Sequence, residues 1–318
     1  MTLSRRPALA LAAALTLTTA LPAFALAPEG WSPLLEPAQL SALLAQHGDE
    51  IRIVQITGDY AAGHIPGAEW SPYAAWRSDM PNPGALRDLA HLQTVVRELG
   101  IDTDTPVVVV HAGANATDMG AAARVYWTLK SLGIADLALL NGGLAAWSGA
   151  GLPTETAPAS ALPSEYVAHW SDAWRATTDQ VTQMAADGSA RLLDARPADF
   201  FEGLTWSVAA PGTIHGADNV AYSQFFDGTR LVGADRIRAL AGQSGYAQGT
   251  TAVSFCNTGH WAAINWFALS EVAGYADVRL YAESMAEYTA DGSRPLDHAP
   301  NRLQYAWRAT SRWVAGLF

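Results

Sequence analysis

The residue best suited to covalent chemistry is Cys256, the single cysteine among the 318 residues. It follows the apolar strand-like run 252–255, and a helical pattern begins near Ala262. A cysteine between a buried strand and a helix N-terminus lies among unpaired backbone N–H groups, which favour its thiolate. The same amides could hold a persulfide, whose charge lies on the outer sulfur. The loop that follows the cysteine has five residues: Asn257, Thr258, Gly259, His260 and Trp261.

A lone cysteine cannot form an internal disulfide, so Cys256 is a buried inert residue, an intermolecular link or a reactive thiol. An inert core cysteine would more often lie inside an apolar run than open a polar loop. Gly259 permits a positive φ, which allows the loop to curl around one point. We therefore predict that Cys256 is a nucleophile.

The first 25 residues have the layout of a secretory signal peptide. A basic start, Arg5-Arg6, precedes the apolar run 8–21, and small residues precede a cleavage site after Ala25. The apolar run is short for a bilayer span, which needs about 20 residues. We expect a periplasmic or secreted protein without a membrane span in the mature chain. The arginine pair suggests twin-arginine export, but Pro7 and Ala8 follow it, so the choice between this route and Sec stays open.

The composition predicts two well-packed domains and excludes some partners. Half of the residues are hydrophobic and 15% are charged. The formal net charge is −11, and loss of the two leader arginines makes it more negative still. Such a chain repels nucleic acid and anionic lipid, and it needs a local positive site to bind a small anion. We expect no metal site, because the histidines lack metal-ligand spacing; those considered are His64, His111, His169, His215 and His260.

The two halves of the chain repeat the same landmarks in the same order: a buried strand, a glycine-containing turn, a second buried strand and a helical pattern. In the first half these features cover 52–56, 63–68, 107–110 and 122–132. In the second half they cover 191–195, 212–217, 252–255 and 262–272. Strands that alternate with helices predict an α/β fold, with a parallel sheet covered by helices on both faces in each half.

The predicted domains span 26–153 and 165–318, and the proline-containing segment 154–164 is the expected linker. The second domain has about ten additional residues around 203–210, which we expect to form a surface loop. Its last stretch, 301–318, has a basic amphipathic pattern, and we expect a helix that packs on its own domain rather than on a membrane. The apolar face of that helix would carry Leu303, Trp307, Thr310, Val314 and Leu317.

Several of these segments resemble the rhodanese family. They are Asp194-Ala195-Arg196, the turn 212–217 and the Cys256 loop, together with 141–147 and 151–153, which resemble the end of a rhodanese domain. The two-domain arrangement is similar to thiosulfate and 3-mercaptopyruvate sulfurtransferases, and the resemblance extends over almost the whole mature chain. It implies two tandem rhodanese-like domains, of which only the second carries the cysteine.

Alignment of the two halves places His111 where the second domain has Cys256, and Gln55 where it has Asp194. The first domain is therefore expected to be catalytically empty and to serve the interface. The resemblance implies that the Cys256 thiolate takes the outer sulfur of thiosulfate or a related donor, and that a thiophilic acceptor then removes it, without a cofactor. Asp194 and Arg196 would brace the loop, bind substrate or form a plain structural ion pair.

The cysteine loop differs from that of the thiosulfate-using members of the family that the chain resembles. Asn257 and Thr258 are neutral where those relatives commonly have basic residues, and Phe200 stands where they have an arginine. Positive charge must then come from loop amides, Arg196 or a protonated His260. His260 either titrates near neutrality or packs in the loop. Trp261 either forms a wall of the substrate site or covers the helix start.

Two other enzyme classes fit poorly. A cysteine phosphatase needs an arginine six residues after the cysteine, where this chain has Ala262. A cysteine protease needs a histidine–asparagine pairing, and none is evident. The remaining alternative is a non-catalytic periplasmic persulfide carrier that relays sulfur between protein partners. The expected partners are thus a small sulfur-containing anion or thiol, and a protein sulfur acceptor in the carrier alternative.

Overall fold

The computed structural model describes residues 27–300, 304 and 307. The predicted leader and all but two residues of the predicted C-terminal helix lie outside this part of the chain.

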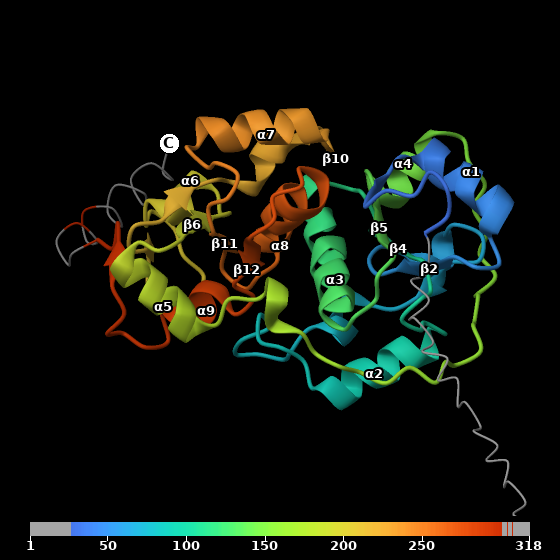
Figure 1. Ribbon diagram of the computed structural model, residues 1–318, viewed down its shortest axis with the longest axis horizontal. Coiled ribbons are helices and arrows are strands. Elements are labelled where there is room, and N and C mark those ends of the chain that lie inside the picture. Colours follow the sequence, from blue (N-terminus) through green and yellow to red (C-terminus); the bar gives the residue numbers. More distant parts are fainter. Residues whose placement is uncertain (1–26, 301–303, 305–306, 308–318) are drawn as a thin grey trace, which may run out of the picture.

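A five-stranded parallel sheet organises the first domain (Figure 1). In spatial order its strands are β1 (Leu34–Leu35), β5 (Leu137–Leu140), β4 (Val107–Val110), β2 (Arg52–Gln55) and β3 (Glu69–Trp70). The helices are α1 (Pro37–His47), α2 (Leu89–Glu98), α3 (Met119–Ser131) and α4 (Gly143–Gly149). In β4 the side chains alternate between two cores: Val108 and Val110 face α1 and α4, and Val107 and Val109 face α2 and α3. The sheet is therefore covered on both faces, which explains its continuous run of valines.

The second domain repeats this architecture around a four-stranded parallel sheet. In spatial order its strands are β12 (Val278–Leu280), β11 (Ala252–Phe255), β6 (Arg191–Asp194) and β8 (Asp218–Asn219). Helices α5 (Thr178–Asp187) and α9 (Ser284–Tyr288) contribute to the core on one face, and α7 (Ala234–Gln243) and α8 (Trp261–Trp266) to that on the other. The predicted α/β fold with two tandem domains is confirmed.

Three smaller features complete the second domain. A short helix, α6 (Ala198–Phe201), follows β6. Two antiparallel pairs lie outside the main sheet: β9 (Phe226–Asp227) with β10 (Arg230–Leu231), and β7 (Thr213–Ile214) with β13 (Leu296–Asp297). The helix predicted over 262–272 is not one continuous α-helix, because α8 passes into a π-helical turn over Phe267–Val272.

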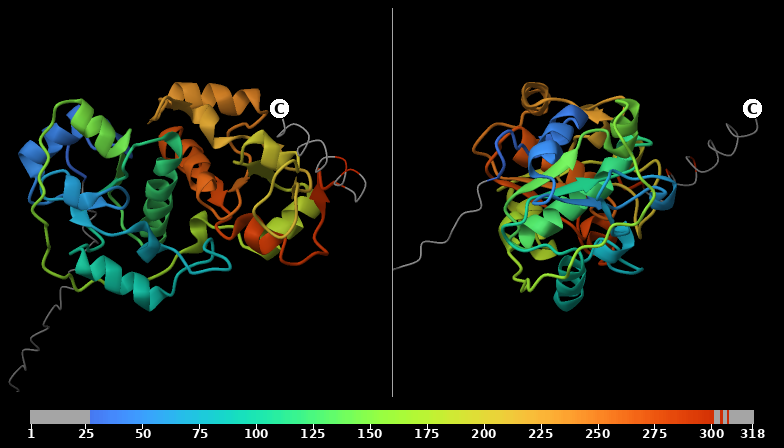
Figure 2. Two further views of the ribbon diagram at one scale, coloured as in Figure 1. Left: turned by 180° about the vertical axis from the view of Figure 1, so that it is seen from behind. Right: turned by 90° about the vertical axis from the view of Figure 1, so that its right-hand side faces the viewer.

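The two domains meet where α3 packs against α8, at the centre of the molecule (Figures 1 and 2). Tyr126 of α3 lies edge-on to Phe267, with ring centroids 5.0 Å apart, and its hydroxyl donates to Glu271 Oε2 at 2.8 Å. Lys130 forms an ion pair with the same carboxylate at 2.7 Å. One hydrophobic core continues from α3 of the first domain into α8 of the second. The interface is therefore built like a domain interior, which fixes the relative position of the two sheets.

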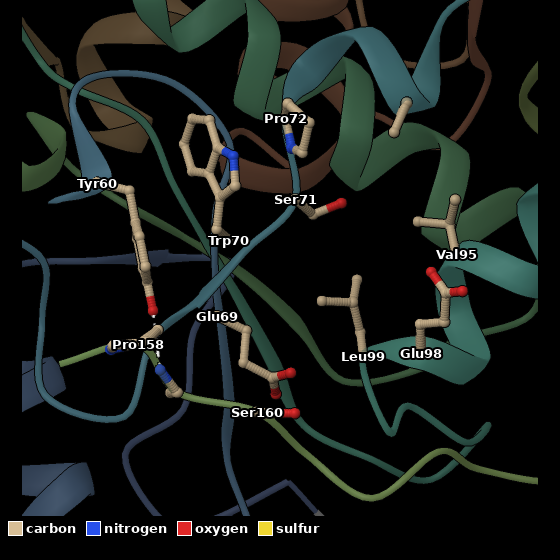
Figure 3. Close-up of a pocket in the computed structure, with 12 residues that line it drawn as sticks. Tyr60, Glu69, Trp70, Ser71, Pro72, Val95, Glu98, Leu99, Pro158 and Ser160 are labelled. Carbon is tan, nitrogen blue, oxygen red and sulfur yellow. Dashed lines mark hydrogen bonds between the residues drawn. The ribbon is translucent and has the colours of Figure 1, made fainter.

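The predicted linker is attached to the first domain as it runs past α2 (Figure 1). His64 and Glu155 exchange two backbone hydrogen bonds of 2.9 Å, and Ala161 N–H donates to the Glu69 carboxylate at 3.0 Å. A cavity of about 450 Å³ lies between the linker and the first domain, with Glu69 and Glu98 on its wall (Figure 3). Burial raises the pKa of Glu69. Since this cavity is lined by the first domain and the linker alone, it is separate from the Cys256 loop.

Candidate active site

Cys256 lies at the carboxyl end of β11, and its side chain is buried with 1% exposure. Its backbone is held on both sides by the start of α9. The Cys256 N–H donates to Ser284 Oγ at 3.1 Å, and its carbonyl accepts from Met285 N–H at 3.0 Å. Ser284 Oγ in turn donates to the Tyr281 carbonyl at 2.7 Å. Cys256 is thus fixed by a neighbouring strand-to-helix turn as well as by its own strand.

The turn that holds Cys256 has an unusual backbone conformation. Ser284 has a φ of 55°, in the left-handed region that costs a non-glycine residue roughly 1 kcal/mol. The first domain repeats the turn: Leu144 N–H donates to the His111 carbonyl at 2.8 Å, and Gly143 takes the left-handed position with a φ of 61°. A glycine would therefore fit the turn without this cost. The hydrogen bond to the Cys256 amide is what the serine adds.

The carbonyls of residues 256–258 point toward α9 and the first domain, where they find hydrogen-bond donors. The carbonyls of Cys256 and Asn257 accept from Met285 and Ala286 N–H, and that of Thr258 accepts from Arg77 at 2.8 Å. In a trans peptide the next N–H points the opposite way. Within residues 27–300, no protein acceptor pairs with the N–H groups of residues 257–260. Such a row of free amides favours a thiolate or a persulfide beside it.

Gly259 is needed for this arrangement. Its φ is 72°, and a Cβ at this position would collide with the Ala282 carbonyl and the Arg124 guanidinium. The loop can therefore curl only because this residue has no side chain.

Asp194 and Arg196 form a completely buried ion pair at the end of β6, with Nη2 and Oδ2 2.6 Å apart. Arg196 Nη1 also donates to Asn257 Oδ1 at 3.2 Å, and Nη2 donates to the Gly212 carbonyl at 2.7 Å. Thr213 Oγ1 donates to the Asp194 carboxylate at 2.7 Å. With its charge neutralised by Asp194, Arg196 supports the loop through Asn257. It does not line the cavity beside Cys256.

A cavity of about 280 Å³ opens in front of Cys256. The cysteine loop forms one wall, and Ser207 comes from the additional loop predicted over 203–210. Arg77 and Thr117 come from the first domain. Reasoning from the sequence missed these three residues, although the lack of basic residues in the cysteine loop indicated that a cation must come from elsewhere.

Arg77 is the cation on the cavity wall. Its Nε donates to the Pro83 carbonyl, Nη1 to the Tyr73 hydroxyl and Nη2 to the Thr258 carbonyl, each at 2.8 Å. These bonds use three of its five N–H groups, which leaves two for a ligand. The guanidinium is therefore fixed in position while it keeps capacity to bind an anion.

A second cation, Arg124 of α3, is buried behind the cysteine loop. Its Nη2 donates to the Gly84 carbonyl at 2.8 Å, and its guanidinium lies 4.9 Å from the Trp127 ring centroid. Burial, reinforced by the charge of Arg77, lowers the pKa of Arg124 to about 10, so it stays charged at neutral pH. A charged residue inside the small and apolar helical run 119–132 was the available sequence signal for it.

His260 is neutral in this structure, contrary to the hypothesis that it supplies positive charge. Burial is the main cause that lowers its pKa to about 4, and the charge of Arg77 contributes. The Thr117 carbonyl lies 2.8 Å from Nε2, which therefore carries the proton, and the Tyr73 hydroxyl donates to Nδ1 at 3.2 Å. The alternative, in which His260 packs in the loop, agrees with these contacts. Both partners belong to the first domain.

Trp261 borders the cavity and is itself the first residue of α8. Its ring stacks on Tyr222, with centroids 5.2 Å apart, and meets Phe200 edge-on. Its indole N–H donates to Thr117 Oγ1 at 2.6 Å. The two alternatives considered for this residue are therefore compatible.

The equivalent loop of the first domain has two of its amides occupied. Ala112 N–H donates to Thr57 Oγ1 at 2.9 Å, and Ala114 N–H donates to the Asp118 carboxylate at 2.8 Å. His111, in the place of the cysteine, is fully buried, and burial lowers its pKa to about 4. Side chains of the first domain thus take two of the amides whose equivalents in the cysteine loop have no protein acceptor in the described part of the chain.

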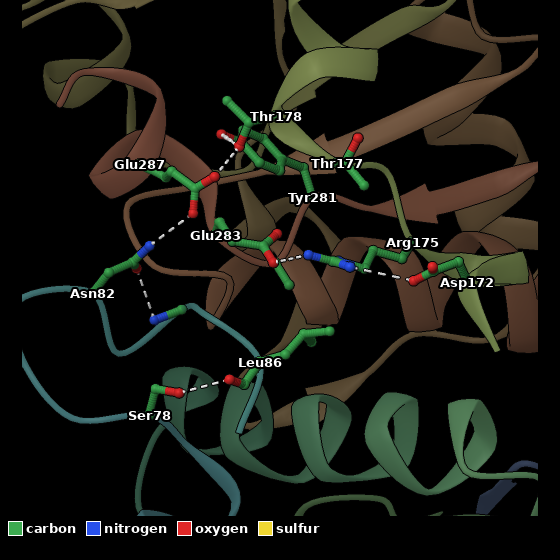
Figure 4. A network of polar contacts seen from close by, with 12 residues as sticks. Ser78, Asn82, Leu86, Asp172, Arg175, Thr177, Thr178, Tyr281, Glu283 and Glu287 are labelled. Atoms are coloured by element: carbon green, nitrogen blue, oxygen red, sulfur yellow. Dashed lines mark hydrogen bonds and ion pairs between the residues drawn. The ribbon is translucent and has the colours of Figure 1, made fainter. Parts of the chain in front are cut away.

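A polar network surrounds α9 and includes one contact between the two domains (Figure 4). Asn82 of the first domain donates to Glu287 of α9 at 3.4 Å, and the same carboxylate accepts from Thr178 at 2.5 Å. Nearby, Arg175 and Glu283 form an ion pair of 2.5 Å. Of these contacts, the one between Asn82 and Glu287 links the segment that carries Arg77 to the second domain.

Over residues 27–300, 304 and 307, no cluster of three or more histidine, cysteine or acidic side chains is arranged to hold a metal ion. No helix in the same part of the chain is long and apolar enough to span a membrane.

Comparison with known proteins is consistent with the two-domain arrangement. The model of the rhodanese-like domain matches residues 37–150 and 177–291. Over 280 residues the chain is 32% identical to a Mycobacterium tuberculosis protein with the provisional name thiosulfate sulfurtransferase SseB; this alignment covers 83% of the chain and 96% of the relative. Over 259 residues it is 29% identical to the sulfur carrier protein TtuD of Thermus thermophilus, with coverage of 75% and 88%.

The same fold is found in the crystal structure of SseA from Escherichia coli, described as a 3-mercaptopyruvate sulfotransferase. The TM-score is 0.71 at 24% sequence identity, and the match covers 80% of this chain and 98% of that one.

Substitution of Ser284 tests its role in positioning Cys256. Ser284→Gly removes both the hydrogen bond to the Cys256 amide and the cost of the left-handed backbone, so we expect thermal stability close to that of the wild type. Without a fixed loop, alkylation of Cys256 by iodoacetamide at neutral pH should slow about fivefold, with its pH profile shifted upward, because a hydrogen bond of this kind contributes about 1 kcal/mol. Ser284→Ala, which keeps the backbone cost, should also lose stability. A wild-type alkylation profile in Ser284→Gly would contradict this role.

The two buried histidines predict lower stability in mild acid. His111 and His260 have a pKa of about 4 when folded, compared with 6.5 when unfolded. Between these values only the unfolded chain binds the protons, so the free energy of unfolding falls as the pH drops from about 6.5 to 4. Each histidine contributes at most about 1.4 kcal/mol per pH unit. Urea unfolding at pH 7 and pH 5 should show that His260→Gln is less sensitive to acid than the wild type; equal sensitivity would argue against a neutral His260.

Proposed function

The chain belongs to the rhodanese family, and from this premise we propose that it is a sulfurtransferase that works through a persulfide on Cys256. It would move a sulfane sulfur from thiosulfate or a related anionic donor to a thiophilic acceptor. The observation that supports this most strongly is the combination of a single thiol, a row of free loop amides and the fixed cation Arg77 around one cavity.

In the first step the Cys256 thiolate attacks the outer sulfur of the donor. A new bond forms between Sγ and that sulfur, while the bond to the leaving group breaks. With thiosulfate, sulfite departs with the electron pair. Arg77 and the amides of residues 257–260 lie where negative charge is present throughout this exchange, so they stabilise the donor, the persulfide and the leaving anion.

In the second step an acceptor nucleophile, such as cyanide or a thiolate, attacks the outer sulfur of the persulfide. The bond to Sγ breaks, and its electron pair returns to Cys256 as the thiolate. The enzyme is thus regenerated without a cofactor, and the two half-reactions predict ping-pong kinetics.

The first domain has a positioning and charge-supplying role in this proposal. It contributes Arg77 and Arg124, and it holds the cysteine loop through the contacts of His260 and Trp261 with Thr117. We also propose that the protein is exported to the periplasm or secreted, a prediction that rests on the leader sequence alone.

A persulfide carrier is the second candidate function, and the similarity to the sulfur carrier TtuD of Thermus thermophilus favours it. In that case a protein would deliver or receive the sulfur, and turnover with small molecules would be slow. The chemistry at Cys256 would be the same.

A thiosulfate-to-cyanide assay separates these functions. We expect the purified mature protein to turn over many times and Cys256→Ser to be inactive, because the substitution removes the nucleophile. Stoichiometric sulfur loading without turnover would support the carrier instead. Full activity of Cys256→Ser would contradict both functions.

The charge supplied by Arg77 can be tested with two alkylating reagents of similar size. Iodoacetate is an anion and iodoacetamide is neutral, so a fixed cation beside Cys256 should favour iodoacetate. Arg77→Gln should slow the iodoacetate reaction about tenfold or more relative to iodoacetamide, in line with about 1.5–3 kcal/mol for a hydrogen bond to a charged group.

The exposed Arg238→Gln in α7 is the matched control, since it removes the same charge away from the cavity. It should leave the ratio of the two rates unchanged. If Arg77→Gln slows both reagents equally, Arg77 acts on the shape of the loop and not through its charge.

A further inference from the structure

A second cavity adjoins the one at Cys256. Its volume is about 520 Å³, and it shares Ser207 and Thr258 with the cysteine cavity. Three segments form its walls: residues 80–83 of the first domain, residues 207–209 of the additional loop, and one side of α9 and the residues after it. We call it the apolar groove, and its remaining lining residues are Met80, Pro81, Asn82, Pro83, Val208, Ala209, Ala286, Glu287 and Ala290.

The groove differs in chemical character from the cysteine cavity. Most of its lining is hydrocarbon, and it has no lysine or arginine. Its one charged residue, Glu287, already accepts hydrogen bonds from Thr178 and Asn82 (Figure 4). A small sulfur anion would gain nothing there and would be repelled by the carboxylate. An uncharged hydrocarbon chain would be desolvated favourably.

The additional loop gives the groove one of its walls. Residues 203–210 have no counterpart in the first domain, and the loop is packed at its base, where Gly203 lies against His298. A wall of this kind is unnecessary for binding thiosulfate beside Arg77. It fits a substrate that extends beyond the cysteine cavity.

We propose that the apolar groove binds the hydrocarbon chain of a thiol acceptor whose sulfur reaches the Cys256 persulfide across the rim formed by Ser207 and Thr258. This inference rests on the proposed function and specifies its second substrate as an uncharged thiol with an apolar chain. The anionic donor is assigned to the cysteine cavity, because the cation Arg77 lies there and not in the groove.

The transfer needs no further reactant. The acceptor thiol gives its proton to solvent, and its sulfur forms a bond with the outer sulfur of the persulfide. The bond between that sulfur and Sγ breaks, and the electron pair returns to Cys256. The product is the acceptor persulfide, which leaves along the groove.

The test separates the two half-reactions. Protein loaded with thiosulfate and freed of excess donor is mixed with ethanethiol, butanethiol or hexanethiol, whose thiol pKa values are similar. The second-order rate of sulfur removal should rise about three- to fourfold for each methylene that enters the groove. Cyanide, which has no chain, serves as the reference acceptor.

A carboxylate placed in the groove should abolish this dependence. Ala209 lines the groove and is exposed, so Ala209→Asp is expected to fold. It should slow sulfur removal by hexanethiol at least tenfold and leave thiosulfate loading and removal by cyanide unchanged. Ala210→Asp is the matched control, since it adds the same charge to the same loop at a residue that does not line the groove.

The possible outcomes distinguish this inference from the proposed function. Loading by thiosulfate without a chain-length effect, or an effect that persists in Ala209→Asp, would overturn the acceptor groove and leave the sulfurtransferase intact. A chain-length effect on loading by alkanethiosulfonate anions, which give up their outer sulfur and leave as sulfinates, with none on removal by thiols, would assign the groove to the donor and also overturn it. Failure to load any sulfur would overturn the proposed function and this inference with it.

Discussion

The packing of α3 against α8 is the contact on which the rest of the site depends. It continues one hydrophobic core across both domains, so the cysteine loop at the start of α8 has a fixed position relative to Arg77 and Arg124. Both cations belong to the first domain, so it is this packing that places them beside Cys256 of the second domain. An acidic chain thereby creates a local positive region around one thiol, and the proposed chemistry with an anionic donor depends on that region.

The loops after His111 and Cys256 have the same framework but differ in how many of their backbone N–H groups have a partner in the protein. Equivalent turns hold the backbone of His111 and of Cys256. In the first domain, Thr57 and Asp118 occupy two of the loop amides, whereas the equivalent amides of Asn257 and Gly259 have no acceptor within residues 27–300. The first domain thus has the same turn and contributes residues across the interface, and the second domain has the amides that can bind a ligand.

The sequence predicted the features that are local or periodic. Both central strands, 107–110 and 252–255, agree with the structure, since short runs that are apolar throughout or, as in 252–255, apolar except for one serine are typical of buried parallel strands. The role of Arg77 depends on a contact with Thr258, 181 residues away, which no local pattern encodes. The same holds for the low pKa of His260, because burial by the first domain causes it. The left-handed conformation of Ser284 was also missed, since serine gives no signal for it.

In the proposed chemistry, Cys256 accepts sulfur as a persulfide beside cations from the other domain. Mass spectrometry of the intact protein after brief exposure to thiosulfate is the sharpest test of this step. We expect one added sulfur, located on the Cys256 peptide, lost again on treatment with cyanide and formed more slowly in Arg77→Gln. Absence of the added sulfur in a folded protein with an accessible thiol would contradict it.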